Sequence, residues 1–107
     1  MDLGLKGKKA IVTGGTRGIG RAIANLLTEE GCDIGICARP ATQIEEASVA
    51  FKVKGVKAFG SVVDVADGAQ LTSFVKSTAG ALGGLDIFIS NVSALGVGND
   101  EPRGRKA

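Results

Sequence analysis

The sequence predicts an α/β fold in which a doubly wound parallel sheet has the strand order 3-2-1-4. Two observations lead to this prediction. Short apolar runs alternate with patterns of helical spacing, which is typical of βαβ units and a parallel sheet. A cluster of glycines, Gly14, Gly15, Gly18 and Gly20, separates the first apolar run from the first helical pattern. Because crossovers between parallel strands are right-handed, few other orders are open to four such strands.

The first strand is expected at residues 10–13, where a short apolar run is typical of a strand buried on both faces. The first helix is expected at residues 18–30, with Gly31 as its C-cap. Its large apolar residues recur at the three- and four-residue spacing of one helix face, which we expect to be buried: Ile19, Ile23, Leu26 and Leu27.

The remaining elements follow from the same patterns. We expect strands at 33–38, 56–65 and 85–90 and helices at 42–54 and 68–82, with Gly55 and Gly83 as helix stops. The buried helix faces should consist of Ile44, Ala47 and Phe51 in the second helix and Leu71, Phe74, Val75, Thr78 and Leu82 in the third. Residues 1–95 are expected to form one domain, and 96–107 a flexible tail.

Composition excludes several classes of function. The chain has 107 residues, 44% hydrophobic and 22% charged, as in a small soluble domain. The net charge is +2 with both signs interspersed, so neither nucleic acid nor a membrane is an expected partner. No apolar run is long enough for a membrane span and the N-terminus lacks a signal-peptide layout, so a cytoplasmic location is expected. The chain has no histidine, and Cys32 and Cys37 match no metal-ligand spacing; we expect both to be buried fillers and no metal site.

The glycine-rich stretch predicts an anion site. A strand that enters a helix through glycines directs free backbone N–H groups and the positive end of the helix to one point, which is usually filled by phosphate. Glycine also allows positive φ and close approach of a pyrophosphate. The spacing Thr13-Gly14-x-x-x-Gly18-x-Gly20 differs from the G-x-G-x-x-G dinucleotide pattern, and no Gly-Lys-Ser/Thr of a P-loop follows.

With Thr13 before the glycines and Ile19 between the last two, the stretch resembles the short-chain dehydrogenase/reductase family, including 3-oxoacyl-carrier-protein reductases. The resemblance covers about residues 5–95 and implies the cofactor-binding half of a Rossmann-type fold. The implied activity is hydride transfer between a nicotinamide dinucleotide and a carbonyl or alcohol. The candidate cofactor-binding residues in the turn are Gly14, Thr16, Arg17, Gly18, Ile19 and Gly20.

The end of the second strand indicates which cofactor is bound. In such folds an acid at this point bonds the adenosine ribose, whereas a basic residue accommodates a 2′-phosphate. This chain has Arg39 and no acid there, and Arg17 in the turn could supply a second charge. We therefore expect NADP to be preferred over NAD. The alternative is that Arg39 is only a solvated residue at the strand end.

Two further positions carry the resemblance. Asp64 and Val65 follow the third strand, where the family uses an Asp-Val pair to bond the adenine amino group and cover its ring; the alternative is a turn aspartate. Ser90-Asn91-Val92-Ser93 aligns with the family's Asn-Asn-Ala-Gly, with Asn91 on the second asparagine, which flanks the nicotinamide ribose. The chain departs from that motif at its other three positions.

The family's catalytic serine and Tyr-x-x-x-Lys pair have no counterpart here, because the chain contains no tyrosine. We therefore expect no catalytic residue in this chain and a sheet truncated after its fourth strand. The open strand, with Ile87, Phe88 and Ile89, is then a site for self-association. Three alternatives stay open: a non-catalytic nucleotide-binding module, an inert fragment, and a flavodoxin-like domain, which would not need the turn spacing or Arg39.

Overall fold

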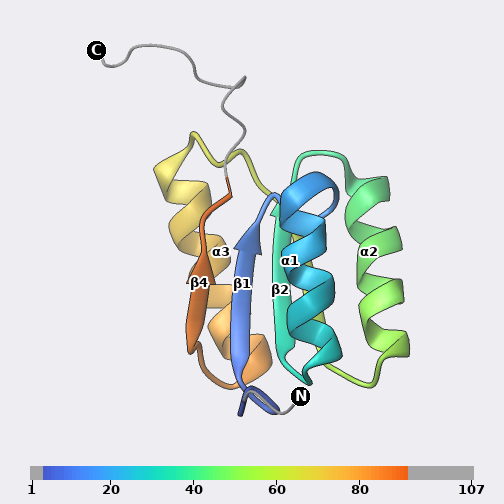
Figure 1. The fold of residues 1–107 in the computed structure, drawn as a ribbon. Coiled ribbons are helices and arrows are strands. Elements are labelled where there is room, and N and C mark those ends of the chain that lie inside the picture. Colours follow the sequence, from blue (N-terminus) through green and yellow to red (C-terminus); the bar gives the residue numbers. More distant parts are fainter. Residues whose placement is uncertain (1–3, 92–107) are drawn as a thin grey trace.

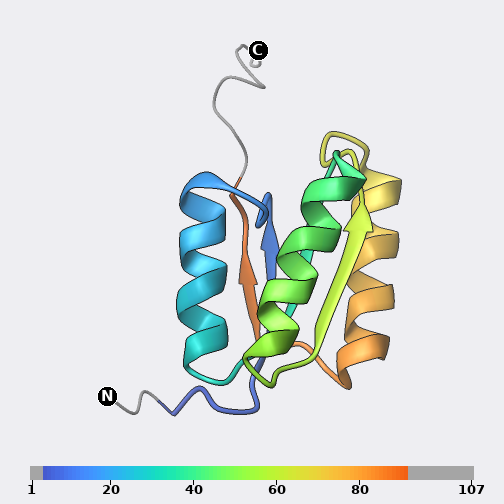
Figure 2. The same cartoon turned by 90° about the vertical axis from the view of Figure 1, so that its right-hand side faces the viewer.

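The computed structural model describes residues 4–91, and these form a three-layer α/β/α arrangement (Figure 1). A four-stranded parallel sheet has the order β3-β2-β1-β4, which confirms the predicted order. Helices α1 and α2 cover one face of the sheet and α3 covers the other, as the turned view shows (Figure 2). The elements are β1 (Lys9–Thr13), α1 (Gly18–Glu29), β2 (Asp33–Ala38), α2 (Ala41–Val53), β3 (Ala58–Val62), α3 (Gly68–Leu82) and β4 (Ile87–Ile89). The end of the expected domain at 92–95 and the expected tail at 96–107 lie outside the described residues.

The core lies on both faces of β1 and β2, the two inner strands. The cluster under α1 and α2 includes Val12, Ile34 and Phe51, all fully buried. The cluster under α3 includes Ile11 and Phe74. The alternation of these residues along β1 follows from the two-residue period of a strand. Cys32 and Cys37 are buried free thiols, one in each cluster, which confirms that they fill the core.

The predicted helix stops Gly55 and Gly83 are confirmed, whereas Gly31 lies one residue beyond the C-cap of α1, which is Glu30 and not Gly31 as expected. Gly31, Gly55 and Gly83 follow α1, α2 and α3, each with positive φ, at 91°, 91° and 87°. The predicted buried faces of α2 and α3 are also observed, with Phe51 fully buried and Phe74 and Leu82 nearly so. These signals are local to each helix, so they can be recognised along the chain.

The predicted buried face of α1 is wrong in part. Ile19 and Leu26 are 74% and 56% exposed, whereas the stripe that faces the sheet consists of Gly20, Ala24, Leu27 and Thr28. The reason is the close approach of the helix to the turn, because only small residues fit where Gly20 meets the backbone of the turn. Apolar spacing therefore identified the helix but not which of its residues face the sheet.

Two strands are shorter than predicted. The third strand pairs with β2 over 58–62 instead of 56–65, and the fourth pairs with β1 over 87–89 instead of 85–90. At its C-terminal end β3 stops at Val62, because its partner Ala38 is the last residue of β2. The short β4 pairs only with residues 10–12 of the five-residue β1. Within residues 4–91, no helix has the length and hydropathy needed to cross a membrane.

Candidate functional site

The candidate residues gather at one edge of the sheet. All four strands run in the same direction, so the turn after β1, the end of β2, the segment after β3 and the end of β4 meet at the upper edge in Figure 1. In an open α/β sheet with the order 3-2-1-4, this carboxyl edge is where ligands bind, beside the switch point between β1 and β4. The residues after β1 and β4 are in direct contact, and those after β2 and β3 form a second contact.

The turn after β1 is held by the neighbouring strand. Gly14 donates its N–H to the carbonyl of Cys37 at 2.8 Å, which continues the β1–β2 ladder by one residue. Its φ is 67°, a conformation that strains any residue with a side chain. A Cβ on Gly15 would lie 2.6 Å from the side chain of Ile36, so the turn is also pressed against the sheet.

Gly20 and Asn91 close the turn on its other side. A Cβ on Gly20 would lie 2.3 Å from the carbonyl oxygen of Gly14 and 2.5 Å from Nδ2 of Asn91. Asn91 donates its backbone N–H to Oγ1 of Thr13 at 2.8 Å. The turn, the start of α1 and the residues after β4 therefore form one packed unit. Thr13 is 1% exposed and was not among the predicted site residues, although its place directly before Gly14 is a signal for it.

The N-terminus of α1 presents the backbone donors that the sequence predicted for an anion. The N-cap is Arg17, which has extended backbone angles and makes no side-chain capping bond. The N–H groups of the first helical turn precede the first i to i−4 bond, which Arg21 makes to the carbonyl of Arg17 at 3.2 Å. Arg17, Gly18 and Ile19 are exposed. An anion can therefore reach these donors and the positive end of the helix.

Arg39 and Asp64 form an ion pair across the ends of β2 and β3. Arg39 Nη2 lies 3.0 Å from Asp64 Oδ2, and both side chains are accessible to solvent, at 73% and 40%. Asp64 also accepts the N–H of Ala66 at 3.0 Å. This backbone bond first, and the Arg39 hydrogen bond second, hold the pKa of the Asp64 carboxyl below its usual range. Arg39 is thus exposed to solvent but paired with Asp64. Asp64 also stabilises the turn after β3 through the N–H of Ala66, which is the role of a turn aspartate given above as the alternative.

The side chain of Val65 is not fully exposed at the carboxyl edge. It is partly buried and packs against the cluster under α3, which limits how much of its surface a ligand ring could cover. The segment that carries it is fixed by Gln70, whose Oε1 accepts the N–H of Asp64 at 2.9 Å. Asp67 holds Gln70 in turn, because its carboxylate caps α3 through the N–H groups of Ala69 and Gln70.

Sequence reasoning missed three polar residues around the turn: Gln43, Arg21 and Glu46. Oγ1 of Thr16 donates to Oε1 of Gln43 at 3.1 Å, and Nη1 of Arg21 donates to the carbonyl of Thr16 at 3.2 Å. Glu46 of α2 forms an ion pair with Arg21. Helix spacing on α1 places Arg21 beside the neighbouring helix, but nothing in the sequence names its partner on α2.

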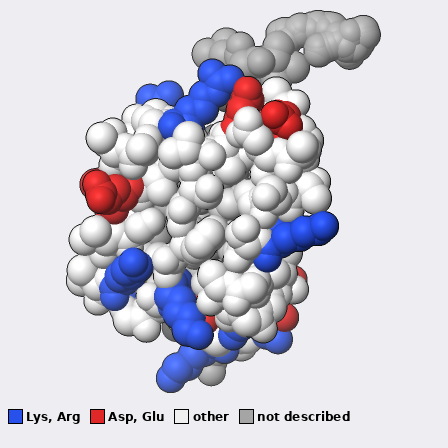
Figure 3. Space-filling view, turned by 180° about the vertical axis from the view of Figure 1, so that it is seen from behind, with Lys and Arg blue, Asp and Glu red and all other residues white. Residues whose placement is uncertain are grey.

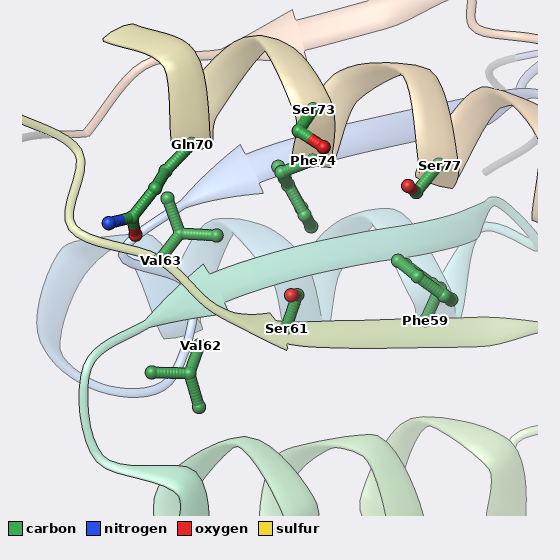
Figure 4. A pocket seen from close by; sticks show the side chains of 8 residues that line it. All are labelled: Phe59, Ser61, Val62, Val63, Gln70, Ser73, Phe74 and Ser77. Atoms are coloured by element: carbon green, nitrogen blue, oxygen red, sulfur yellow. The ribbon is translucent and has the colours of Figure 1, made fainter. Parts of the chain in front are cut away.

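Two hollows of the described surface lie away from the candidate residues. One, about 310 Å³, runs between β3 and α3, where the aromatic rings of Phe59 and Phe74 face each other beside Ser61 and Ser77 (Figure 4). A second lies between β3 and α2. None of the candidate residues lines either hollow. In Figure 3 the middle of the face covered by α3 shows no charged side chain, and Lys and Arg side chains are scattered around this area. Residues 4–91 hold no group of three or more His, Cys, Asp or Glu side chains placed to bind a metal.

The order of the parallel sheet and the glycine turn at its switch point define a Rossmann-type, nucleotide-binding class of fold. A family model described as short chain dehydrogenase matches residues 8–104. The chain belongs to the short-chain dehydrogenase family, which confirms the resemblance seen in the sequence.

Known proteins with related sequences are longer. The chain is 36% identical over 98 residues to isoepoxydon dehydrogenase patN of Penicillium expansum, covering 89% of this chain and 38% of that protein. It is 38% identical over 85 residues to 3-oxoacyl-[acyl-carrier-protein] reductase FabG of Staphylococcus aureus, covering 78% of this chain and 35% of that protein. The chain thus spans less than two fifths of the length of these relatives.

Solved structures with the same fold have been determined with nicotinamide cofactors. L-Sorbose reductase from Gluconobacter frateurii, complexed with NADPH and L-sorbose, matches with a TM-score of 0.83 and 36% identity, over 100% of this chain and 40% of that chain. An NAD+-bound xylitol dehydrogenase matches with a TM-score of 0.74 and 32% identity, over 78% of this chain and 32% of that chain. The expected cofactor, a nicotinamide dinucleotide, agrees with the cofactors of these neighbours, which are NADPH in one structure and NAD+ in the other.

Proposed function

We propose that this chain binds NADP(H) for an oxidoreductase that transfers a hydride between the nicotinamide and a carbonyl or alcohol substrate. The observation that carries the proposal is the exposed, uncapped N-terminus of α1 behind a glycine turn, with Arg39 at the same edge of the sheet. In this arrangement the turn and Gly18–Gly20 receive the pyrophosphate. Asn91, packed against Gly14, faces the nicotinamide half of the cofactor.

The preference for NADP rests on Arg39 and Arg17. A guanidinium binds phosphate through paired, charge-assisted hydrogen bonds, and both side chains are exposed at the carboxyl edge. Asp64 supports this role because its bond to Nη2 orients the Arg39 guanidinium. Charge-assisted bonds contribute roughly 1.5–3 kcal/mol each, which corresponds to a preference of about tenfold to a hundredfold for the phosphorylated cofactor.

The chain's own residues hold and orient the cofactor, and no catalytic residue is assigned to them. The family resemblance places proton transfer on a tyrosine, and the 107 residues contain neither tyrosine nor histidine. The substrate and activity of the whole protein are part of this proposal, since the chain spans 38% of its isoepoxydon dehydrogenase relative. A cytoplasmic location is also part of it.

Titration of the 107-residue chain with NADPH and with NADH, followed by nicotinamide fluorescence, tests the proposal. The wild type should bind NADPH about tenfold or more tightly than NADH. Arg39→Ala should reduce this preference, because only Arg17 then remains to bind the 2′-phosphate. Lys76→Ala removes the same charge from α3, away from the carboxyl edge, and should leave it unchanged. Equal affinity of the wild type for both cofactors would refute the NADP preference.

Two alternatives are separated by the same titration. Saturable binding without turnover of added carbonyl substrates would favour a non-catalytic nucleotide-binding module. Binding of neither cofactor would favour an inert fragment. We also propose self-association through β4, because among the described residues it pairs only with β1 and Phe88 is 45% exposed.

A further inference from the structure

The interface between α1 and α2 contains a charged side chain that cofactor binding as proposed above does not use. Arg21 of α1 is 21% exposed and binds both oxygens of Glu46 of α2, Nη1 to Oε1 at 3.1 Å and Nη2 to Oε2 at 3.2 Å. Its guanidinium lies over the ring of the buried Phe51, 5.3 Å from the centroid. Two-point binding and ring stacking fix the direction of this planar group more closely than a single contact would.

The same guanidinium reaches the glycine turn. Its Nη1 donates to the backbone carbonyl of Thr16 at 3.2 Å, in addition to the bond with Glu46. The side chain of Thr16, 6% exposed, donates to Oε1 of Gln43 on α2. The turn is therefore tied to α2 twice, through its backbone by way of Arg21 and directly through its threonine hydroxyl.

This connection joins two parts of the candidate site. The turn lies at the proposed pyrophosphate position, and α2 begins at Ala41, two residues after Arg39. A contact between the turn and α2 therefore sets the distance between the pyrophosphate donors and the proposed 2′-phosphate ligand. We propose that Arg21 is a positioning residue of the cofactor site, which together with Glu46 holds the glycine turn against α2; this inference rests on the proposed function.

Arg21 acts through geometry and not as a ligand of the phosphates. Both terminal nitrogens are bound to the Glu46 carboxylate, which neutralises the charge, and Nε donates to Oδ1 of Asn25 at 3.3 Å. Its exposed fraction is small beside the 73% of Arg39. A variant that keeps the positive charge but loses the planar two-point geometry should therefore impair binding nearly as much as a neutral variant.

Lys54 offers a matched control on the same interface. Its Nζ lies 6.0 Å from the centroid of the Phe51 ring and 3.5 Å from Oε2 of Glu29. It also donates to the carbonyl of Asn25 and to Oγ1 of Thr28, each at 3.2 Å. Lys54 thus joins α1 to the end of α2 by the same kinds of contact, and none of its hydrogen bonds reaches the turn.

The test compares Arg21→Lys, Arg21→Met and Glu46→Gln with Lys54→Met. The thermal midpoint and the Kd for NADPH are measured for each. We expect the Kd to rise about fivefold to tenfold in both Arg21 variants, which corresponds to about 1–1.4 kcal/mol and lies within the range found for coupling through residues that do not touch the ligand. The Kd of Lys54→Met should stay within about twofold of the wild type at a similar loss of thermal stability.

Hydrogen exchange of the cofactor-free chain provides a readout that does not require NADPH. Amides of residues 14–18 should exchange faster in Arg21→Lys and Glu46→Gln than in Lys54→Met and the wild type, because the turn loses its tie to α2. Unchanged exchange of the turn in both of these variants would overturn the inference, as would an equal rise in Kd for Lys54→Met. If the wild type binds neither cofactor, the proposed function fails, and the exchange comparison still decides the role of Arg21.

Discussion

Gly20→Ala gives the sharpest test of how tightly the site is packed. The added Cβ would lie 2.3 Å from the Gly14 carbonyl oxygen and 2.5 Å from Nδ2 of Asn91. Non-bonded heavy atoms settle at roughly 3.5 Å, so the carbonyl must retreat by about 1 Å or α1 must move away from the sheet. Alanine is favoured over glycine in a helix by about 1 kcal/mol, whereas overpacking costs about 1–3 kcal/mol. We expect a net destabilisation of about 1 kcal/mol, and the distorted turn should also weaken NADPH binding.

Gly80→Ala is the matched control for this prediction. Gly80 also lies inside a helix, α3, but a Cβ there would have nothing within 4 Å. Only the preference of a helix for alanine over glycine, about 1 kcal/mol, should then act in Gly80→Ala. It should raise the thermal midpoint by roughly 4–8 °C for a domain of this size. Differential scanning fluorimetry measures the thermal midpoint of both variants, and titration with NADPH measures their Kd. A Gly20→Ala chain that is as stable as Gly80→Ala and binds NADPH like the wild type would refute the packing argument.

Three further predictions concern stability and association. Thr78→Val should stabilise the chain by about 1 kcal/mol, measured by urea unfolding, because the buried Oγ1 has no hydrogen-bond partner among the described residues; a loss of stability would point to a bond that it makes. Phe88→Lys should shift the sedimentation profile toward monomer, since it adds a charge to the open edge, and an unchanged profile would exclude β4 from self-association. The Arg21 hydrogen bond, and secondarily its charge, hold the pKa of Glu46 below the ordinary 4.5. The contribution of the pair is therefore present above that pH and lost as the pH falls through the lowered pKa, so the difference in thermal midpoint between wild type and Glu46→Gln should be smaller near pH 3 than near pH 7.

The helix ends could be predicted because their signals are local, and the strand order because right-handed crossovers leave few orders open. Gly31, Gly55 and Gly83 mark helix ends wherever the chain folds, since their positive φ is a property of a few neighbouring residues. The turn spacing after β1 was likewise sufficient to indicate the family, which the match over residues 8–104 confirms. The roles assigned to the individual cofactor-binding residues remain predictions.

The tertiary structure alone decided which polar groups meet. Arg39 and Asp64, like Arg21 and Glu46, are 25 residues apart, and neither separation carries a signal in the sequence. The orientation of α1 also depended on distant contacts, because the room beside Gly20 is set by Gly14 and Asn91. The sequence by itself determined the family and the edge of the sheet where the site lies, since βα order and glycine spacing are written along the chain. How the site is held together depends on side chains from neighbouring layers, and these come into contact only when α1 and α2 pack on the sheet.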